Sequence, residues 1–333
     1  MTALSILVNP VVMIGMFWVV PTGLALLDGP RPPGLVPLRR AWPLLAAPGA
    51  LALWLPRSGF SAGLAAVYAL ATVALALQAP ARLALTRSLR PREIAVLTAL
   101  AAPSVAGLAL VAERASYPLF GFDLDLLALT VPHFHFAGFA AALVAGLVCR
   151  ADDGPTARFA ALSVPAGTLL VLAGYFVDDW AELAGAVVLT AGMAAVAVLT
   201  LRERRELAAG RLTRALLAVS ALVLVVTMLL ALSWALGEAT GLPHLSLTWM
   251  AATHGLGNAL GFAVCALLAR RRLQTDRTNR PDRPDRPDRA DRADRADRAD
   301  RAATPSPTLP TPTHPAHPAH PAHPAHQRTE LPA

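Results

Sequence analysis

Long apolar blocks recur along the first 270 residues, and they constrain the fold more than any other feature of this sequence. Each holds few or no charged residues, and the chain as a whole is 55% hydrophobic and 15% charged. The blocks lie at 4–27, 42–56, 59–79, 93–112, 126–149, 158–177, 181–201, 213–236 and 247–270. A helix of about 20 apolar residues crosses a bilayer core of roughly 30 Å. We therefore predict an all-α, polytopic transmembrane helix bundle of about nine spans, in which 42–56 either crosses or forms a re-entrant segment.

Arginine residues are distributed unevenly between the loops that connect these blocks. Arg-rich segments follow the first, third, fifth, seventh and ninth blocks, whereas the other loops hold Arg57 alone or are mainly acidic. Loops rich in Lys and Arg stay on the cytoplasmic side. The alternation therefore predicts an N-terminus outside, a C-terminal end inside and an odd number of crossings.

The composition changes abruptly after Arg272. An Asp-Arg-Pro or Asp-Arg-Ala repeat is followed by a His-Pro-Ala repeat, and neither contains large apolar side chains that could form a core. We predict a transmembrane domain over 1–272 and a disordered cytoplasmic tail over 273–333. From Arg270 onwards 13 Arg stand against 9 acidic residues, so this region supplies +4 of the net +7 and the basic balance does not indicate a nucleic-acid partner. The repeated histidines favour weak binding of a divalent metal ion; they are His314, His317, His320, His323 and His326.

Three further histidines lie inside predicted spans. His133 and His135 are in the fifth block and His254 is in the ninth, at a similar depth from the outer side. An ionisable residue inside a membrane span is costly and marks a functional site by default. At 100° per residue, small residues share a helix face with His135 and with His254, and such faces allow another helix to approach closely.

The matched depth and the small-residue faces predict that His135 and His254 face each other in the outer half of the bilayer. Asn258, one turn below His254, would hydrogen-bond an imidazole or a ligand. His133 lies about 160° from His135 on a regular helix, so it would point elsewhere unless Pro132 alters the local backbone. The alternative is that each histidine only joins neighbouring helices through a hydrogen bond.

Two classes of function fit these residues. The first is a transporter-like permease whose polar site is formed by His135, His254, Asn258 and His133. The second is a redox or sensor protein in which His135, His254 and His133 bind a transition metal or haem, since neutral imidazole suits Zn, Cu and Fe. The sequence contains no phosphate-binding Gly-rich loop, HExxH or CxxC motif, which argues against an enzyme of those classes.

Three carboxylates precede and begin the seventh block. Asp178, Asp179 and Glu182 are predicted to lie at the outer mouth, where they could gather cations. The competing interpretation is a helix start, in which Asp179 and Glu182 form a pair like a capping box. Both interpretations remain open at this point.

Two motifs carry a family resemblance. The stretch HFHFAGF at 133–139, together with HGLGNALGF at 254–262, resembles the YndJ-like family of bacterial multi-pass membrane proteins. The resemblance covers the fifth to ninth blocks. It implies an integral protein of the bacterial inner membrane with the lipid bilayer as its partner, and it implies no particular chemistry.

The alternation of charged loops generates a test of topology. A reporter fused after residue 272 should behave as cytoplasmic, and one inserted in the loop 114–124 as external, because only the first of these regions is Arg-rich. Paired alkaline phosphatase and green fluorescent protein fusions would measure this. The opposite location of either reporter would contradict the predicted orientation.

Overall fold

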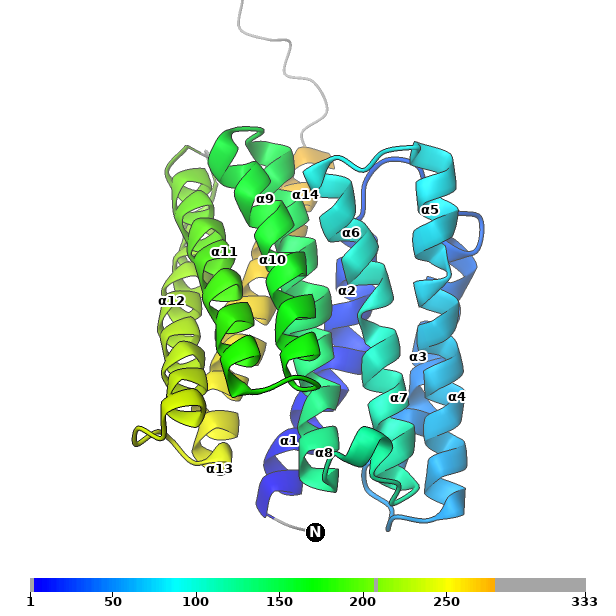
Figure 1. Ribbon diagram of the computed structural model, residues 1–333. Helices are drawn as coiled ribbons and strands as arrows, with labels where there is room; N and C mark the ends of the chain where they lie inside the picture. Colours follow the sequence, from blue (N-terminus) through cyan, green and yellow to red (C-terminus); the bar gives the residue numbers. More distant parts are fainter. Residues whose placement is uncertain (1–2, 207–208, 279–333) are drawn as a thin grey trace, which may run out of the picture. The chain divides into compact units, whose positions relative to one another are not determined.

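The computed structural model describes residues 3–206 and 209–278, and this part of the chain is built from helices without a β-strand (Figure 1). The predicted all-α bundle is therefore confirmed. The His-Pro-Ala repeat and most of the predicted tail lie beyond Thr278, outside the described residues.

Eight helical stretches of the described residues are long and apolar enough to cross a membrane. They match eight of the nine predicted blocks: Ser5–Leu26, Gly59–Thr86, Pro91–Arg114, Leu124–Ala151, Pro155–Gly174, Asp179–Arg205, Arg211–Thr240 and Leu247–Asp276. An integral membrane protein follows from their length and composition.

The block predicted at 42–56 is replaced by a helix with different bounds. Helix α3 spans Leu35–Ala52, so it begins seven residues earlier and includes Arg39 and Arg40, and it is not among the eight apolar stretches. Its 18 residues extend about 27 Å, and in Figure 1 it runs beside α4 between the same two ends of the bundle. Side chains from other helices terminate it: Asn9 donates to Leu53 O at 2.8 Å and Arg114 to Ala52 O at 3.1 Å.

Several spans consist of more than one helical segment. The first contains α1 (Ala3–Ile14), the π-helical η1 (Gly15–Val19) and α2 (Val20–Leu26). Beyond α3 come α4 (Gly59–Ala76) with α5 (Gln78–Thr86), and α6 (Pro91–Ala101) with α7 (Pro103–Arg114). The short 3₁₀ turn η2 (Leu119–Gly121) then leads to α8 (Leu124–His133), the π-helical η3 (Phe134–Ala140) and α9 (Ala141–Ala151).

The remaining spans begin with three uninterrupted helices. These are α10 (Pro155–Gly174), α11 (Asp179–Glu206) and α12 (Arg211–Thr240). The final span comprises α13 (Leu247–Met250), the π-helical η4 (Ala251–Gly255) and η5 (Gly257–Val264), and α14 (Cys265–Thr278).

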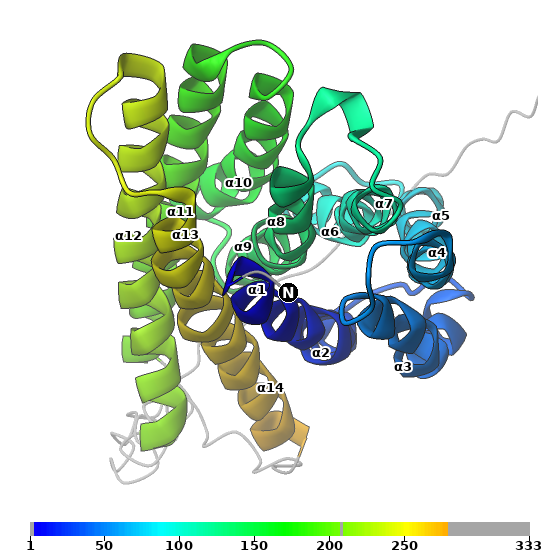
Figure 2. The ribbon, with the colours of Figure 1, turned by 90° about the horizontal axis from the view of Figure 1, so that it is seen from below.

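The span that contains His133 and His135 is the central one. Its apolar window is 83% buried, against 33–56% for the other seven. Seen along the helices in Figure 2, α8 and α9 lie between α1–α2, α6–α7 and α10. Most of this span therefore contacts protein and little of it faces lipid.

The π-helical segments of the first, central and last spans meet one another. Contacts join η1 to η3, η3 to η5 and η1 to η5. Glycine permits the close approach of η1, since a Cβ on Gly15 would lie only 2.9 Å from the Cβ of His135. Short π-helical turns are rare and often occur at functional sites, so their convergence singles out this level of the bundle.

One buried arginine joins several segments at one end of the bundle. The Arg82 guanidinium is 1% exposed and binds both Glu93 carboxylate oxygens, at 2.8 and 3.0 Å. It also donates to the carbonyl oxygens of Asp28 (3.0 Å) and Pro30 (3.1 Å). This one side chain therefore joins the loop after α2 to α5 and α6.

Replacing this arginine should destabilise the fold. Arg82→Met leaves Glu93 and two carbonyl groups without their partner, and breaking a buried ion pair costs roughly 3–5 kcal/mol. Heating detergent-solubilised protein and following its elution in size-exclusion chromatography would measure the loss. Arg40→Met is the matched control, because Arg40 is exposed. Equal midpoints for the two variants would contradict the role of Arg82.

Candidate functional site

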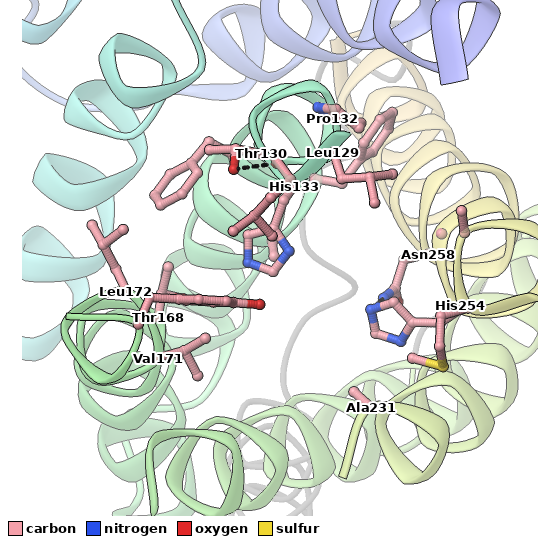
Figure 3. Close-up of a pocket in the computed structure, with 18 of the residues that line it drawn as sticks. Leu129, Thr130, Pro132, His133, Thr168, Val171, Leu172, Ala231, His254 and Asn258 are labelled. Carbon is pink, nitrogen blue, oxygen red and sulfur yellow. Dashed lines mark hydrogen bonds between the residues drawn. The ribbon is translucent and has the colours of Figure 1, made fainter. Parts of the chain in front are cut away.

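A cavity of about 300 Å³ lies among the central span, the first span and the helices from α10 to η5. Apolar side chains form most of its wall, and a small number of polar groups project into it (Figure 3). Those polar groups are Thr130, His133, Thr168, Tyr175, Glu182, Trp234, His254 and Asn258. An apolar cavity with a few convergent polar groups is typical of a small-molecule site.

A closed hydrogen-bond ring fixes two of these residues on one side of the cavity. His254 Nδ1 donates to Thr227 O at 2.8 Å, so Nε2 carries the lone pair and accepts from Asn258 Nδ2 at 3.1 Å. Asn258 Oδ1 in turn accepts from Thr227 Oγ1 at 2.8 Å. The ring joins α12 to η4 and η5, and it leaves the second Asn258 N–H as a potential donor to a ligand.

His133 projects from the opposite side of the cavity, as Figure 3 shows. It ends α8, packs edge-on against Phe134 with ring centroids 5.6 Å apart, and lines the same cavity as His254. Among the described residues no hydrogen bond to its ring is found. His133 therefore offers both a donor and an acceptor to the cavity.

His135 does not face His254, and that part of the prediction is wrong. Its ring is fully buried on the other side of the central span, where Nδ1 donates to Val131 O at 2.7 Å. The Tyr68 hydroxyl donates to Nε2 at 2.5 Å, and the two rings are stacked with centroids 6.0 Å apart. Both nitrogens are thus satisfied, and His135 is not among the described residues that line the cavity.

His133 and His135 lie on opposite sides of the central span, as their angular separation predicts, but His133 and not His135 faces the cavity. The chain changes from α8 to the π-helical η3 directly after His133. Pro132 lies just before this change and was the only local signal of it. Nothing in the sequence indicated Tyr68, a residue 67 positions away, as the partner of His135.

The three acidic residues of the predicted outer mouth separate into two roles. Asp178 caps α11 by accepting from Ala181 N at 2.7 Å, so the cap lies one residue earlier than the predicted Asp179. Asp178 and Asp179 are exposed, whereas Glu182 is only 8% exposed and lines the cavity beside Tyr175. Burial and this carboxylate raise the pKa of Tyr175, so its hydroxyl stays protonated as a donor.

The histidines are not arranged as a set of metal ligands. Across residues 3–206 and 209–278, no group of three or more His, Cys, Asp or Glu side chains could hold a metal ion. His135 and His254 have both ring nitrogens engaged in hydrogen bonds, which leaves His133 with a free imidazole.

Residues 10–262 match the family model described as YndJ-like protein. The chain belongs to the YndJ-like family. No curated protein and no solved structure matches it. The matched region begins within α1 and ends within η5, so the family match of this YndJ-like protein includes every histidine and the asparagine of the cavity region.

The contact between Tyr68 and His135 generates a stability prediction. Tyr68→Phe leaves the buried His135 Nε2 without a donor, at a cost of about 1–3 kcal/mol. The melting temperature of the purified protein should fall, while Tyr117→Phe, whose side chain is 58% exposed, should leave it unchanged. Identical melting of both variants would show that the hydroxyl contributes nothing to the fold.

Proposed function

We propose that this YndJ-like protein is a transporter-like permease that admits a small, largely apolar solute to the cavity and binds its polar group at His133, His254 and Asn258. The wall is mostly apolar, with few polar groups, which suits recognition of such a solute. Asn258 supplies a fixed donor, and His133 supplies a donor and an acceptor from the opposite side.

The observation that carries this proposal is the unbonded ring of His133. A polar group in hydrocarbon without a partner costs several kcal/mol, and the neighbouring His135 and His254 both have partners for each ring nitrogen. A solute or water in the cavity would supply the missing partner for His133. If His133 had a purely structural role, we would expect each of its ring nitrogens to have a hydrogen-bond partner, as in the other two histidines.

The exposed side chains of the cavity wall lie at one end of the bundle, which supports entry of a solute from that end. Phe120, Phe176 and Leu247 are exposed, whereas Phe136 and Phe262 are buried. The exposed residues lie at or near the starts of α8, α11 and α13, at the end of the bundle where α1 begins (Figure 1). The cavity therefore opens at that end and closes toward the π-helical segments.

The alternation of Arg-rich loops predicts the side of the membrane to which the cavity opens. With the N-terminus outside, the cavity would open to the external side of the bacterial inner membrane, and residues 273–333 would be cytoplasmic. The proposed solute would then enter from outside. The reporter fusions described above test this orientation independently of the site.

A metal- or haem-binding redox or sensor protein is the alternative function. It is supported by His133 and His254 lining the same cavity. His254 would have to release Asn258 to bind a metal through Nε2, which makes this arrangement costlier than a hydrogen-bonded solute. Stoichiometric copper, iron or a haem absorption band in purified protein would favour this alternative.

The permease proposal predicts that water-soluble reagents reach the cavity. In a Cys149→Ala, Cys265→Ala background, single cysteines at His133 and Ala231 should react with a cationic or an anionic methanethiosulfonate in proteoliposomes. Ala160→Cys is the control, because Ala160 is fully buried and does not line the cavity. Mass spectrometry of the intact protein would measure the modification.

Inert cysteines at both cavity positions would contradict the proposal, provided that both variants elute as folded protein. Modification of Ala160→Cys at the same rate would show that the reagents enter through general opening of the bundle. Faster reaction of the cavity cysteines alone supports a water-connected binding site.

A further inference from the structure

Aromatic rings surround the open part of the cavity. Phe122 and Phe176 have ring centroids 5.3 Å apart, Phe120 and Phe176 5.4 Å, and Phe122 and Tyr175 6.2 Å, all at edge-to-face angles. Trp234 of α12 lines the same cavity. Five aromatic side chains from three parts of the chain therefore form its outer wall.

One carboxylate stands among these rings. Glu182 lies in the first turn of α11 and is the only Asp, Glu, Lys or Arg among the described residues that line the cavity. Tyr175 lines the cavity with it, but no Lys, Arg or His within residues 3–206 and 209–278 forms an ion pair with it. A buried carboxylate without a counter-charge is unfavourable unless it takes up a proton or a cation joins it.

We propose that the cavity selects a lipophilic organic cation, whose ammonium group binds Glu182 and the surrounding rings while its apolar body extends inward toward His133. This inference rests on the proposed function and names the class of solute. The faces of Trp, Tyr and Phe rings attract ammonium groups within about 6 Å, and a carboxylate adds the opposite charge.

The side chains of the cavity wall favour a lipophilic organic cation over a metal cation and over an anionic solute. A metal cation such as Ca²⁺ takes about 6–8 oxygen ligands, whereas the outer wall supplies one carboxylate and one phenol among apolar rings. An anionic solute would meet Glu182 with no Lys or Arg in the cavity wall to offset the repulsion. An organic cation satisfies both the charge and the apolar surface.

The depth of the polar groups and the volume limit the size of the solute. Along their own helices Glu182 lies roughly 4.5 Å and His254 roughly 10 Å from the helix start, at 1.5 Å per residue. A volume of about 300 Å³ equals roughly ten water molecules at about 30 Å³ each. A single aromatic ring joined to a short ammonium-bearing chain fits these limits.

A permanently charged probe and its uncharged analogue test the proposal. Binding of trimethyl(2-phenylethyl)ammonium and of (3,3-dimethylbutyl)benzene to the full chain in nanodiscs would be measured by equilibrium binding, with empty nanodiscs subtracted. The cation should bind more tightly than the analogue. Glu182→Gln should weaken cation binding by at least about tenfold and leave the analogue unaffected.

Two further variants make the result specific. Asp179→Asn removes a charge from the same turn of α11 outside the cavity, so it should leave cation binding unchanged. Phe176→Leu keeps an apolar side chain but removes one ring, so it should weaken binding of the cation more than that of the analogue. This second variant tests the site even where Glu182→Gln affects folding.

Several outcomes would overturn the assignment: equal binding of cation and analogue, no binding of the cation, unchanged cation binding in both Glu182→Gln and Phe176→Leu, or displacement of the probe by matched concentrations of sodium ion. These outcomes are distinguishable from failure of the permease proposal. If the cavity cysteines react with methanethiosulfonates and the cation does not bind, only the cation assignment fails. If the cysteines are inert, both proposals fail.

Discussion

Every polar group placed in hydrocarbon needs a partner, and the centre of this bundle is organised by that requirement. His135 meets it through Tyr68 and Val131, and His254 meets it through Thr227 and Asn258. Each set of bonds joins separate spans, so the histidines bring helices together as well as being satisfied. His133 differs because the cavity lies where a partner would otherwise be.

The same requirement explains how the ends of the helices are held. Arg82 binds Glu93 and two loop carbonyls at one end, and Arg114 and Asn9 cover the free carbonyls of α3 at the other. These contacts join the first span, α3, α5, α6 and α7 near their ends. The cavity lies beside the most deeply buried of the eight spans.

Much of the fold could be predicted from the sequence, since long apolar blocks permit few structures other than membrane-spanning helices. The bounds of α3 could not, because they depend on Asn9 and Arg114 from distant parts of the chain. For the site, the sequence singled out His254 and Asn258, and both line the cavity. The choice between His133 and His135 could not be made from the sequence, because it depends on which face of the central span meets Tyr68 and which meets the cavity. Glu182 was noticed only as one acidic residue among three, and its burial depends on the packing of α10 against α11.

The π-helical turn η3 has a consequence for how the central span can vary. A bond pattern from residue i to i+5 holds one more residue per turn than the ordinary i to i+4 pattern. The segments before and after η3 therefore differ in rotational phase by about 100°, the angle that one residue subtends in an α-helix. Loss of one residue there would restore the ordinary i to i+4 pattern and leave α8, with His133, and α9 facing their present neighbours. The π-helical turn thus lets the central span hold one additional residue while α8 keeps its cavity-facing side and α9 keeps its packing contacts.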